Sequence, residues 1–136
     1  MRVVLISCVS KKLDEKAKVK DLYISSLFRY NLRYACLLKP DKIFVLSAKY
    51  GLVGLDEEIE PYDKTLNGMN SVEKKKWADD VFVQLSNEID VDRDEVIFLA
   101  GENYRKYLIE RVKNFRIPLK GLGIGRQLKF LKENVT

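Results

Sequence analysis

Three short apolar runs constrain the fold of this chain more than any other feature. Residues 3–7, 43–47 and 96–100 are dominated by valine, isoleucine, leucine and phenylalanine, and none of them alternates with polar residues. Such runs are typical of strands that are covered on both faces, as in a parallel sheet. Residues 117–122 form a fourth candidate strand, and Pro118 places it at a sheet edge because proline lacks a ladder donor.

Amphipathic helical patterns lie between and after these runs. Apolar side chains recur at helical spacing over residues 24–38, and Asn70 and Glu73 have the spacing of a capping box at the start of a second helix. Two further stripes cover residues 104–115 and 124–135. Strand and helix thus alternate four times, which predicts an α/β fold with a mainly parallel four-stranded sheet and helices on both faces.

Size and composition narrow the class of protein. The chain has 136 residues and predicts one domain over residues 1–136. It has no histidine, which excludes Ser-His-Asp and Cys-His mechanisms and imidazole metal sites. Since the carboxylates show no ligand spacing either, we expect no metal and no cofactor. The chain has two cysteines without paired spacing, so we expect reduced thiols and a cytoplasmic protein. Its N-terminal apolar run is too short to span a membrane, so we expect no membrane partner.

Ligands of open parallel sheets bind outside the carboxyl ends of the strands. The segments that follow the four predicted strands are polar and rich in glycine, in contrast to the strands themselves. We therefore expect a site in these segments, and the long irregular stretch 49–69 is a further candidate because such loops are often functional. The predicted substrate-binding residues are Ser10, Lys11, Lys12, Ser47, Lys49, Tyr50, Gly101, Tyr104, Gly123, Gly125, Arg126 and Gln127.

The cysteines have two interpretations. Cys8 follows the first strand, and the nearby Lys11 and Lys12 would favour a reactive thiolate. The alternative is a small buried residue at a strand end, which is the commoner fate of a free cysteine. Cys36 stands beside two leucines in a helical stretch, and we expect it in the core.

The charged candidates also leave alternatives open. Glu102, Glu60 and Asp63 have the best positions for a general base or for a carboxylate that holds a ribose or a base edge. The alternative for Glu102 is that its negative charge stabilises the positive end of a helix dipole, which needs no substrate. The alternative for Asp63 is that it is a turn residue. The glycines before Arg126 either open a helix end to an anion or merely allow a tight turn. The lysines of residues 11–20 either hold a phosphate or form a solvated loop.

Several motifs carry a resemblance. They are Cys-x-Ser-Lys-Lys from Cys8, Leu-Ser-Ala-Lys-Tyr-Gly-Leu at residues 46–52, Pro-Tyr-Asp-Lys-Thr-Leu at 61–66 and Gly-Leu-Gly-Ile-Gly-Arg-Gln at 121–127. This set resembles an uncharacterised family of small bacterial, archaeal and phage proteins over nearly the whole chain. More distantly, Cys8, Lys12 and Ser25 resemble a segment in the uracil-DNA-glycosylase-like domain of archaeosine synthase, although Leu13 and Asp14 replace its Pro-Tyr. The resemblance implies a three-layer sandwich of the glycosylase-like or flavodoxin-like kind, and a modified base or nucleotide as ligand.

Two functions from different classes follow. The first is a small enzyme that acts on a nucleobase, a nucleoside or a nucleic-acid base, at its glycosidic bond or at a 7-deazaguanine-type substituent, with Cys8, Asp63 and Glu102 as catalytic residues. The second is a non-catalytic module that binds a nucleotide or nucleic acid, which the net charge of +5 and the lysine-rich first loop favour. A purely structural protein is a third interpretation, and it requires that no cavity remains at the strand ends.

Overall fold

A mixed five-stranded sheet organises the fold. The computed structural model describes residues 1–135, and within them the strand order is β4-β3-β1-β6-β7. β1 pairs in parallel with β3 and β6, β6 pairs in parallel with β7, and β4 runs antiparallel to β3. A separate antiparallel pair joins β2 and β5. The bounds are β1 (Arg2–Ser7), β2 (Ala17–Lys18), β3 (Lys42–Ser47), β4 (Gly51–Gly54), β5 (Glu58–Ile59), β6 (Glu95–Leu99) and β7 (Phe115–Arg116).

The three apolar runs form the centre of this sheet, as predicted. The four residues from Val3 to Ile6 in β1 are fully buried, as are those from Val96 to Phe98 in β6. β1 lies between β3 and β6, so both of its edges are paired and both of its faces are covered. The continuous apolar pattern is therefore explained by burial on two sides.

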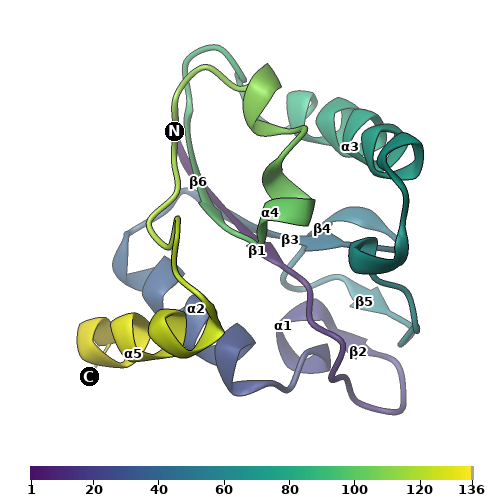
Figure 1. The fold of residues 1–136 in the computed structure, drawn as a ribbon, viewed down its shortest axis with the longest axis vertical. Coiled ribbons are helices and arrows are strands. Elements are labelled where there is room, and N and C mark those ends of the chain that lie inside the picture. Colours follow the sequence, from purple (N-terminus) through teal and green to yellow (C-terminus); the bar gives the residue numbers. More distant parts are fainter. Residues whose placement is uncertain (136) are drawn as a thin grey trace.

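Helices cover both faces of the sheet. In Figure 1, α2 and α5 lie together on one face, and α3 and α4 lie on the other. Asn70 and Glu73 form the predicted capping box at the start of α3, because each side chain accepts a hydrogen bond from the backbone N–H of the other. The bounds are α1 (Val19–Leu22), α2 (Ser26–Leu37), α3 (Ser71–Ser86), α4 (Glu102–Arg105) and α5 (Ile124–Val135), with 3₁₀ turns η1 (Leu66–Gly68) and η2 (Ile109–Arg111). None of these helices is long and apolar enough to cross a membrane within residues 1–135.

The sequence interpretation was wrong about the edges of the sheet. Residues 117–122 form turns rather than a strand, and the last strand is β7, which falls at the end of the stripe expected to be helical. That stripe forms only the short α4 and η2, and its last residue, Phe115, begins β7 and meets Phe98 of β6 edge to face, with ring centroids 6.5 Å apart. The stretch 49–69 is not irregular throughout, since it contains β4, β5 and η1. The sheet is therefore five-stranded and mixed.

Cys36 is also corrected. It is exposed, whereas Phe28, Asn31 and Ala35 form the buried side of α2. One residue advances a helix by about 100°, so Cys36 is turned away from Ala35 toward solvent.

Gly51 makes the reversal between β3 and β4 possible. Its φ of +75° is a backbone conformation that side chains disfavour, and an added Cβ would meet Oε1 of Gln84. That same oxygen accepts a hydrogen bond of 2.9 Å from the backbone N–H of Leu52. Gly51 therefore requires both a left-handed backbone and open space beside it.

We expect Gly51→Ala to lower the free energy of unfolding by about 1 to 3 kcal/mol, from backbone strain and the displaced Gln84 amide. Urea unfolding measures this loss. Gly68→Ala is the matched control, because its added Cβ would meet nothing within 4 Å. Equal stability of the two variants would contradict this account of the turn.

Candidate functional site

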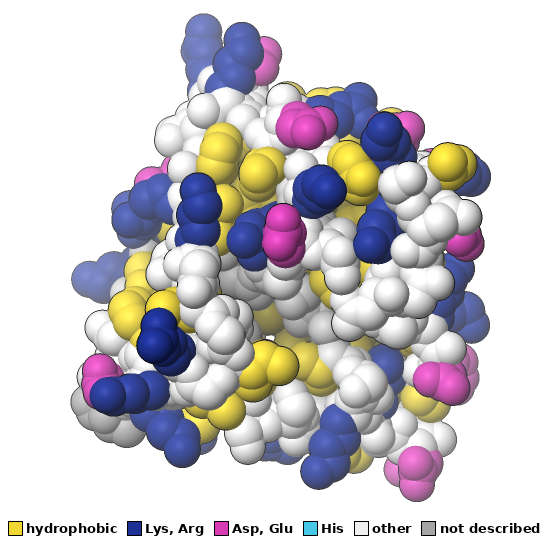
Figure 2. Space-filling model, in the orientation of Figure 1, with side chains coloured by type: hydrophobic (Ala, Val, Ile, Leu, Met, Phe, Trp, Pro, Cys, Tyr) yellow, Lys and Arg dark blue, Asp and Glu magenta, His cyan; other side chains and the backbone are white. Residues whose placement is uncertain are grey.

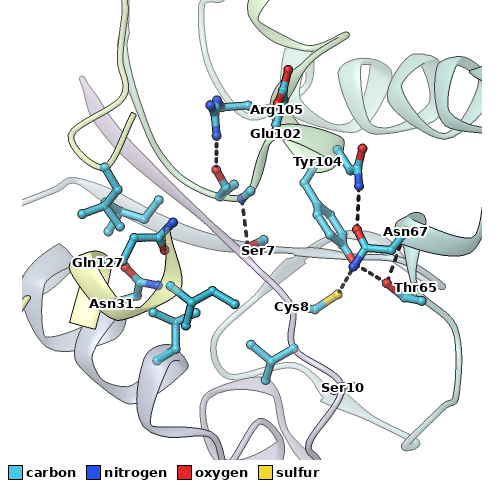
Figure 3. Close-up of a pocket in the computed structure, with 18 of the residues that line it drawn as sticks. Ser7, Cys8, Ser10, Asn31, Thr65, Asn67, Glu102, Tyr104, Arg105 and Gln127 are labelled. Carbon is cyan, nitrogen blue, oxygen red and sulfur yellow. Dashed lines mark hydrogen bonds between the residues drawn. The ribbon is translucent and has the colours of Figure 1, made fainter. Parts of the chain in front are cut away.

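The sheet has a topological switch point between β1 and β6. The chain leaves β1 toward β3 on one side and leaves β6 toward β7 on the other, so their carboxyl ends frame a crevice. A cavity of about 430 Å³ lies there, which we name the switch-point pocket. Figure 2 shows a hollow in this face of the molecule, and Figure 3 shows the pocket itself. It is lined by Ser7, Cys8, Val9, Ser10, Leu27, Asn31, Lys64, Thr65, Asn67, Leu99, Ala100, Gly101, Glu102, Asn103, Tyr104, Arg105, Leu119, Ile124 and Gln127.

One wall is a hydrogen-bonded group around Tyr104. The Cys8 thiol is buried and donates to the Tyr104 hydroxyl over 3.4 Å. That hydroxyl also accepts from the backbone N–H of Leu66 and lies 3.5 Å from the Thr65 hydroxyl (Figure 3). Burial raises the pKa of Tyr104 to about 12, and the nearby Cys8 adds to the shift. Tyr104 therefore stays protonated and ties the end of β1 to the loop before η1.

Trp77 of α3 supports this wall from behind. Its ring meets the Tyr104 ring edge to face, with centroids 5.7 Å apart. Its indole N–H donates to the backbone carbonyl of Ser47 over 3.0 Å. Trp77 thus connects Tyr104 with the end of β3 and leaves the Tyr104 ring little freedom.

The opposite wall comes from α2 and α5. Leu27 and Asn31 contribute from α2, and Ile124 and Gln127 contribute from α5. Gln127 donates from Nε2 to the backbone carbonyl of Leu122 over 2.8 Å, which fixes the orientation of its amide. Figure 3 places Asn31 beside Gln127, across the pocket from Tyr104 and Thr65.

The rim carries the charged groups. Glu102 begins α4 and is exposed, and Arg105 donates from Nη1 to the Ala100 carbonyl over 2.8 Å. Asn103 donates to Oδ1 of Asn67 over 2.6 Å and so connects α4 to η1. Among the lining residues within 1–135, Glu102 supplies the carboxyl group.

A second polar cluster lies outside the pocket lining, and we name it the tyrosine cluster: Lys12, Tyr23, Ser47, Tyr50 and Tyr62. The hydroxyls of Tyr23 and Tyr62 are 2.7 Å apart, and the Ser47 hydroxyl donates to that of Tyr62 over 2.8 Å. The Lys12 ammonium lies 4.3 Å from the centroid of the Tyr62 ring. Burial lowers the pKa of Lys12, while the neighbouring Cys8 and Asp63 act in the opposite direction. Cys8 therefore raises the pKa of a residue in each place, Tyr104 in the pocket and Lys12 in the tyrosine cluster.

Comparison with known proteins identifies the family. The family described as "Family of unknown function (DUF6884)" matches residues 3–133. The chain belongs to this family. The matched range includes every residue that lines the switch-point pocket. No curated protein and no solved structure matches the chain.

The structure gathers part of the predicted site in the pocket. Six of the predicted residues line it, namely Cys8, Ser10, Gly101, Glu102, Tyr104 and Gln127. Lys12, Ser47 and Tyr50 belong to the tyrosine cluster instead. The other six lie outside the lining, namely Lys11, Lys49, Asp63, Gly123, Gly125 and Arg126.

The sequence interpretation missed the amides of the pocket. Asn31, Asn67 and Asn103 all line it, and so does Thr65. One signal was available for Asn31, because it lies three residues after Phe28 and four before Ala35, on the helix face that the apolar pattern predicts to be buried. An amide at such a position indicates either a buried hydrogen bond or a ligand.

Proposed function

We propose that the chain is a small α/β enzyme that binds a nucleobase, a nucleoside or a nucleic-acid base in the switch-point pocket. The observation that carries the proposal is the pocket's combination of place, size and lining. It lies at a switch point of the sheet, and its volume of about 430 Å³ falls in the range of small-molecule sites. A ligand of nucleoside size suits that volume better than a large dinucleotide.

The lining suits the chemistry of a base. Leu27, Leu119 and Ile124 offer apolar surface for the faces of an aromatic ring. Asn31 and Gln127 offer amides, which pair with the polar edges of such a ring. These side chains could therefore bind an uncharged base without a charged group of the protein.

Two reactive groups share the pocket with these amides. Cys8 would contact the reacting atoms from the wall, and Tyr104 would position its thiol. Glu102 would move a proton to or from the substrate at the rim. The distant resemblance to archaeosine synthase makes the glycosidic bond and 7-deazaguanine-type substituents the first reactions to test.

The alternative, a nucleic-acid binding module, rests on charge. In Figure 2, lysine and arginine side chains are spread over the face and mixed with acidic ones instead of forming one continuous patch. Lys11 and Lys12 lie outside the pocket lining. These placements favour recognition of a base in the pocket over recognition of a phosphate backbone.

A thermal-shift screen tests the proposal. Free nucleobases, 7-deazaguanines, nucleosides, nucleotides and short oligonucleotides are each added at low and moderate salt. A ligand that binds only the folded state at about 100 times its Kd adds about 2.7 kcal/mol of stability. We expect a neutral base or nucleoside to raise the melting temperature at both salt concentrations.

Two results would contradict the enzyme proposal. A shift with oligonucleotides alone that disappears at moderate salt would favour the binding module, because phosphate contacts release counterions. No shift with any compound of the screen would remove the assignment of the pocket to bases.

A further inference from the structure

A groove of about 520 Å³ runs along α2 on the side opposite to its buried residues, and we name it the α2 groove. The lining residues that α2 contributes have the spacing i, i+3, i+4, i+7 and i+8, which is one continuous stripe of a helix. They are Arg29, Leu32, Arg33, Cys36 and Leu37. Lys20 of α1 and Val135 of α5 complete the lining.

Part of the groove is apolar and open to water. Leu37 is 58% exposed, and Cys36 beside it is exposed as well. Leu32 and Val135 are partly exposed in the same lining. Single exposed apolar residues are ordinary on a protein surface, but here they gather on one concave surface. Apolar side chains of a partner would remove this surface from water, which favours binding.

The charged residues of the groove are all basic. Lys20, Arg29 and Arg33 line it, and within residues 1–135 no acidic residue does. Lys20 forms an ion pair of 3.3 Å with Asp56, whereas neither arginine forms an ion pair in this part of the chain. The sequence of α2 contains no acidic residue that could neutralise them. The groove is therefore complementary to a partner with negative charges.

The spacing of the two arginines indicates the kind of partner. Arg29 and Arg33 are four residues apart, which separates them by about 6 Å along the axis of α2. Acidic side chains four residues apart on another helix have the same spacing, so a helix that lies in the groove could pair one with each arginine. Like charges at this spacing repel one another within α2, and the partner's carboxylates would offset that repulsion.

Two other occupants fit the groove less well. A fatty acid carries one charged group, which is fewer than the cations of the lining. A second copy of this chain would have to offer acids that already have partners. Asp79 and Asp80 of α3, its longest helix, form ion pairs within the same molecule.

We propose that the α2 groove binds an amphipathic helix of another protein, with acidic residues four positions apart beside a row of leucine-like side chains. Arg29 and Arg33 pair with the carboxylates, and Leu32 and Leu37 contact the apolar row. The α2 groove and the switch-point pocket share no lining residue within residues 1–135. The inference therefore does not depend on the proposed function.

A pair of synthetic peptides tests the binding. Both are cysteine-free helical peptides of about 15 residues with a row of leucines, and one has glutamates four residues apart where the other has glutamines. We expect the protein to bind the glutamate peptide about tenfold or more tightly at low salt, by fluorescence anisotropy, and the difference to shrink at high salt. Equal affinity for the two peptides at low salt would overturn the proposal.

Variants of the protein test whether the peptide lies on α2. Arg33→Glu is expected to weaken binding of the glutamate peptide about tenfold or more, because an attraction becomes a repulsion. Lys129→Glu is the matched control, since Lys129 is an exposed residue of α5 outside the groove lining. Leu37→Gln is also expected to weaken binding, and its exposed position leaves the fold intact. Equal weakening by Arg33→Glu and Lys129→Glu would overturn the proposal, because it would indicate attraction to the net charge alone.

The rate at which iodoacetamide alkylates Cys36 locates the occupant independently. Cys36 is exposed and lines the groove, whereas Cys8 is buried, so the reaction reports on the groove. We expect a saturating amount of the glutamate peptide to slow the alkylation severalfold. An unchanged rate with bound peptide would place the peptide elsewhere and overturn the proposal. Slower alkylation with vesicles of anionic phospholipid but not with the peptide would overturn it in favour of a membrane surface.

Discussion

Replacing Glu102 by glutamine is expected to lower kcat by about 10² to 10⁴-fold, the usual contribution of a positioned acid or base. Glutamine keeps the size of the side chain and its hydrogen bonding but carries no transferable proton. Glu102 is exposed at the rim, and it begins a helix of only four residues. We therefore expect the variant to fold with nearly unchanged stability.

The measurement is steady-state turnover of the compound that the thermal-shift screen identifies. A loss in kcat with little change in KM would indicate a group that acts in the chemical step. Glu110→Gln is the matched control, because Glu110 is an exposed residue of η2 outside the pocket lining. Full turnover by Glu102→Gln would remove its assigned role.

Cys8 is tested in the same assay. If its thiol contacts the reacting atoms, Cys8→Ala loses turnover on a similar scale, whereas the exposed Cys36 tolerates the same change. Normal turnover in Cys8→Ala would leave Cys8 as a buried residue that bonds to Tyr104. The pair of variants thus decides between the two interpretations that the sequence left open for Cys8.

The parts of the fold that follow from local pattern were predictable. The three apolar runs became the central strands because burial on both faces excludes polar residues from them. The capping box at Asn70 and the helix over residues 124–135 follow from spacing alone. Each of these features depends on residues that are close together in the sequence.

The edges of the sheet depend on contacts between distant residues. β4 is only four residues long and is bounded by glycines, so its sequence has no strand pattern to read. Phe115 fits the spacing of a helical stripe, but it lies in β7, where it pairs with Val96 of β6. Pairing with β6 thus overrides the local periodicity at Phe115, whereas β4 is a strand only because it pairs with β3.

The site was predictable where it depends on strand ends. Cys8, Gly101 and Glu102 follow β1 and β6, which are neighbours in the sheet, and all three line the pocket. Ser47 is the last residue of β3, but the chain then reverses into β4, and the Ser47 hydroxyl is buried against Tyr62. Asn31 also lines the pocket, but it lies in the middle of α2. It could not be predicted from the expectation that ligands bind at the carboxyl ends of the strands.

Raising the pH from about 10 to about 12 is expected to lower the free energy of unfolding by roughly 4 kcal/mol through Tyr23 and Tyr104, and by a further amount through Tyr62, whose pKa burial also raises. Tyr23 and Tyr104 are both buried, and burial raises the pKa of each from 10.0 to about 12. The unfolded chain releases these protons near pH 10, whereas the folded chain holds them. Their contribution is therefore complete below pH 10 and is lost as the pH rises through 12, at about 2 kcal/mol for each tyrosine.

Urea unfolding at about pH 9 and about pH 12 measures the loss, and Tyr23→Phe isolates the contribution of Tyr23. Phenylalanine has no proton to release, so the decrease between the two pH values should be about 2 kcal/mol smaller in the variant. The comparison uses the decrease rather than the stability itself, because Tyr23→Phe also removes the hydrogen bond to Tyr62. Lys12 acts in the other direction, since burial lowers its pKa, but it does so in both proteins. An equal decrease in the two proteins would show that the Tyr23 hydroxyl titrates alike in the folded and unfolded chain.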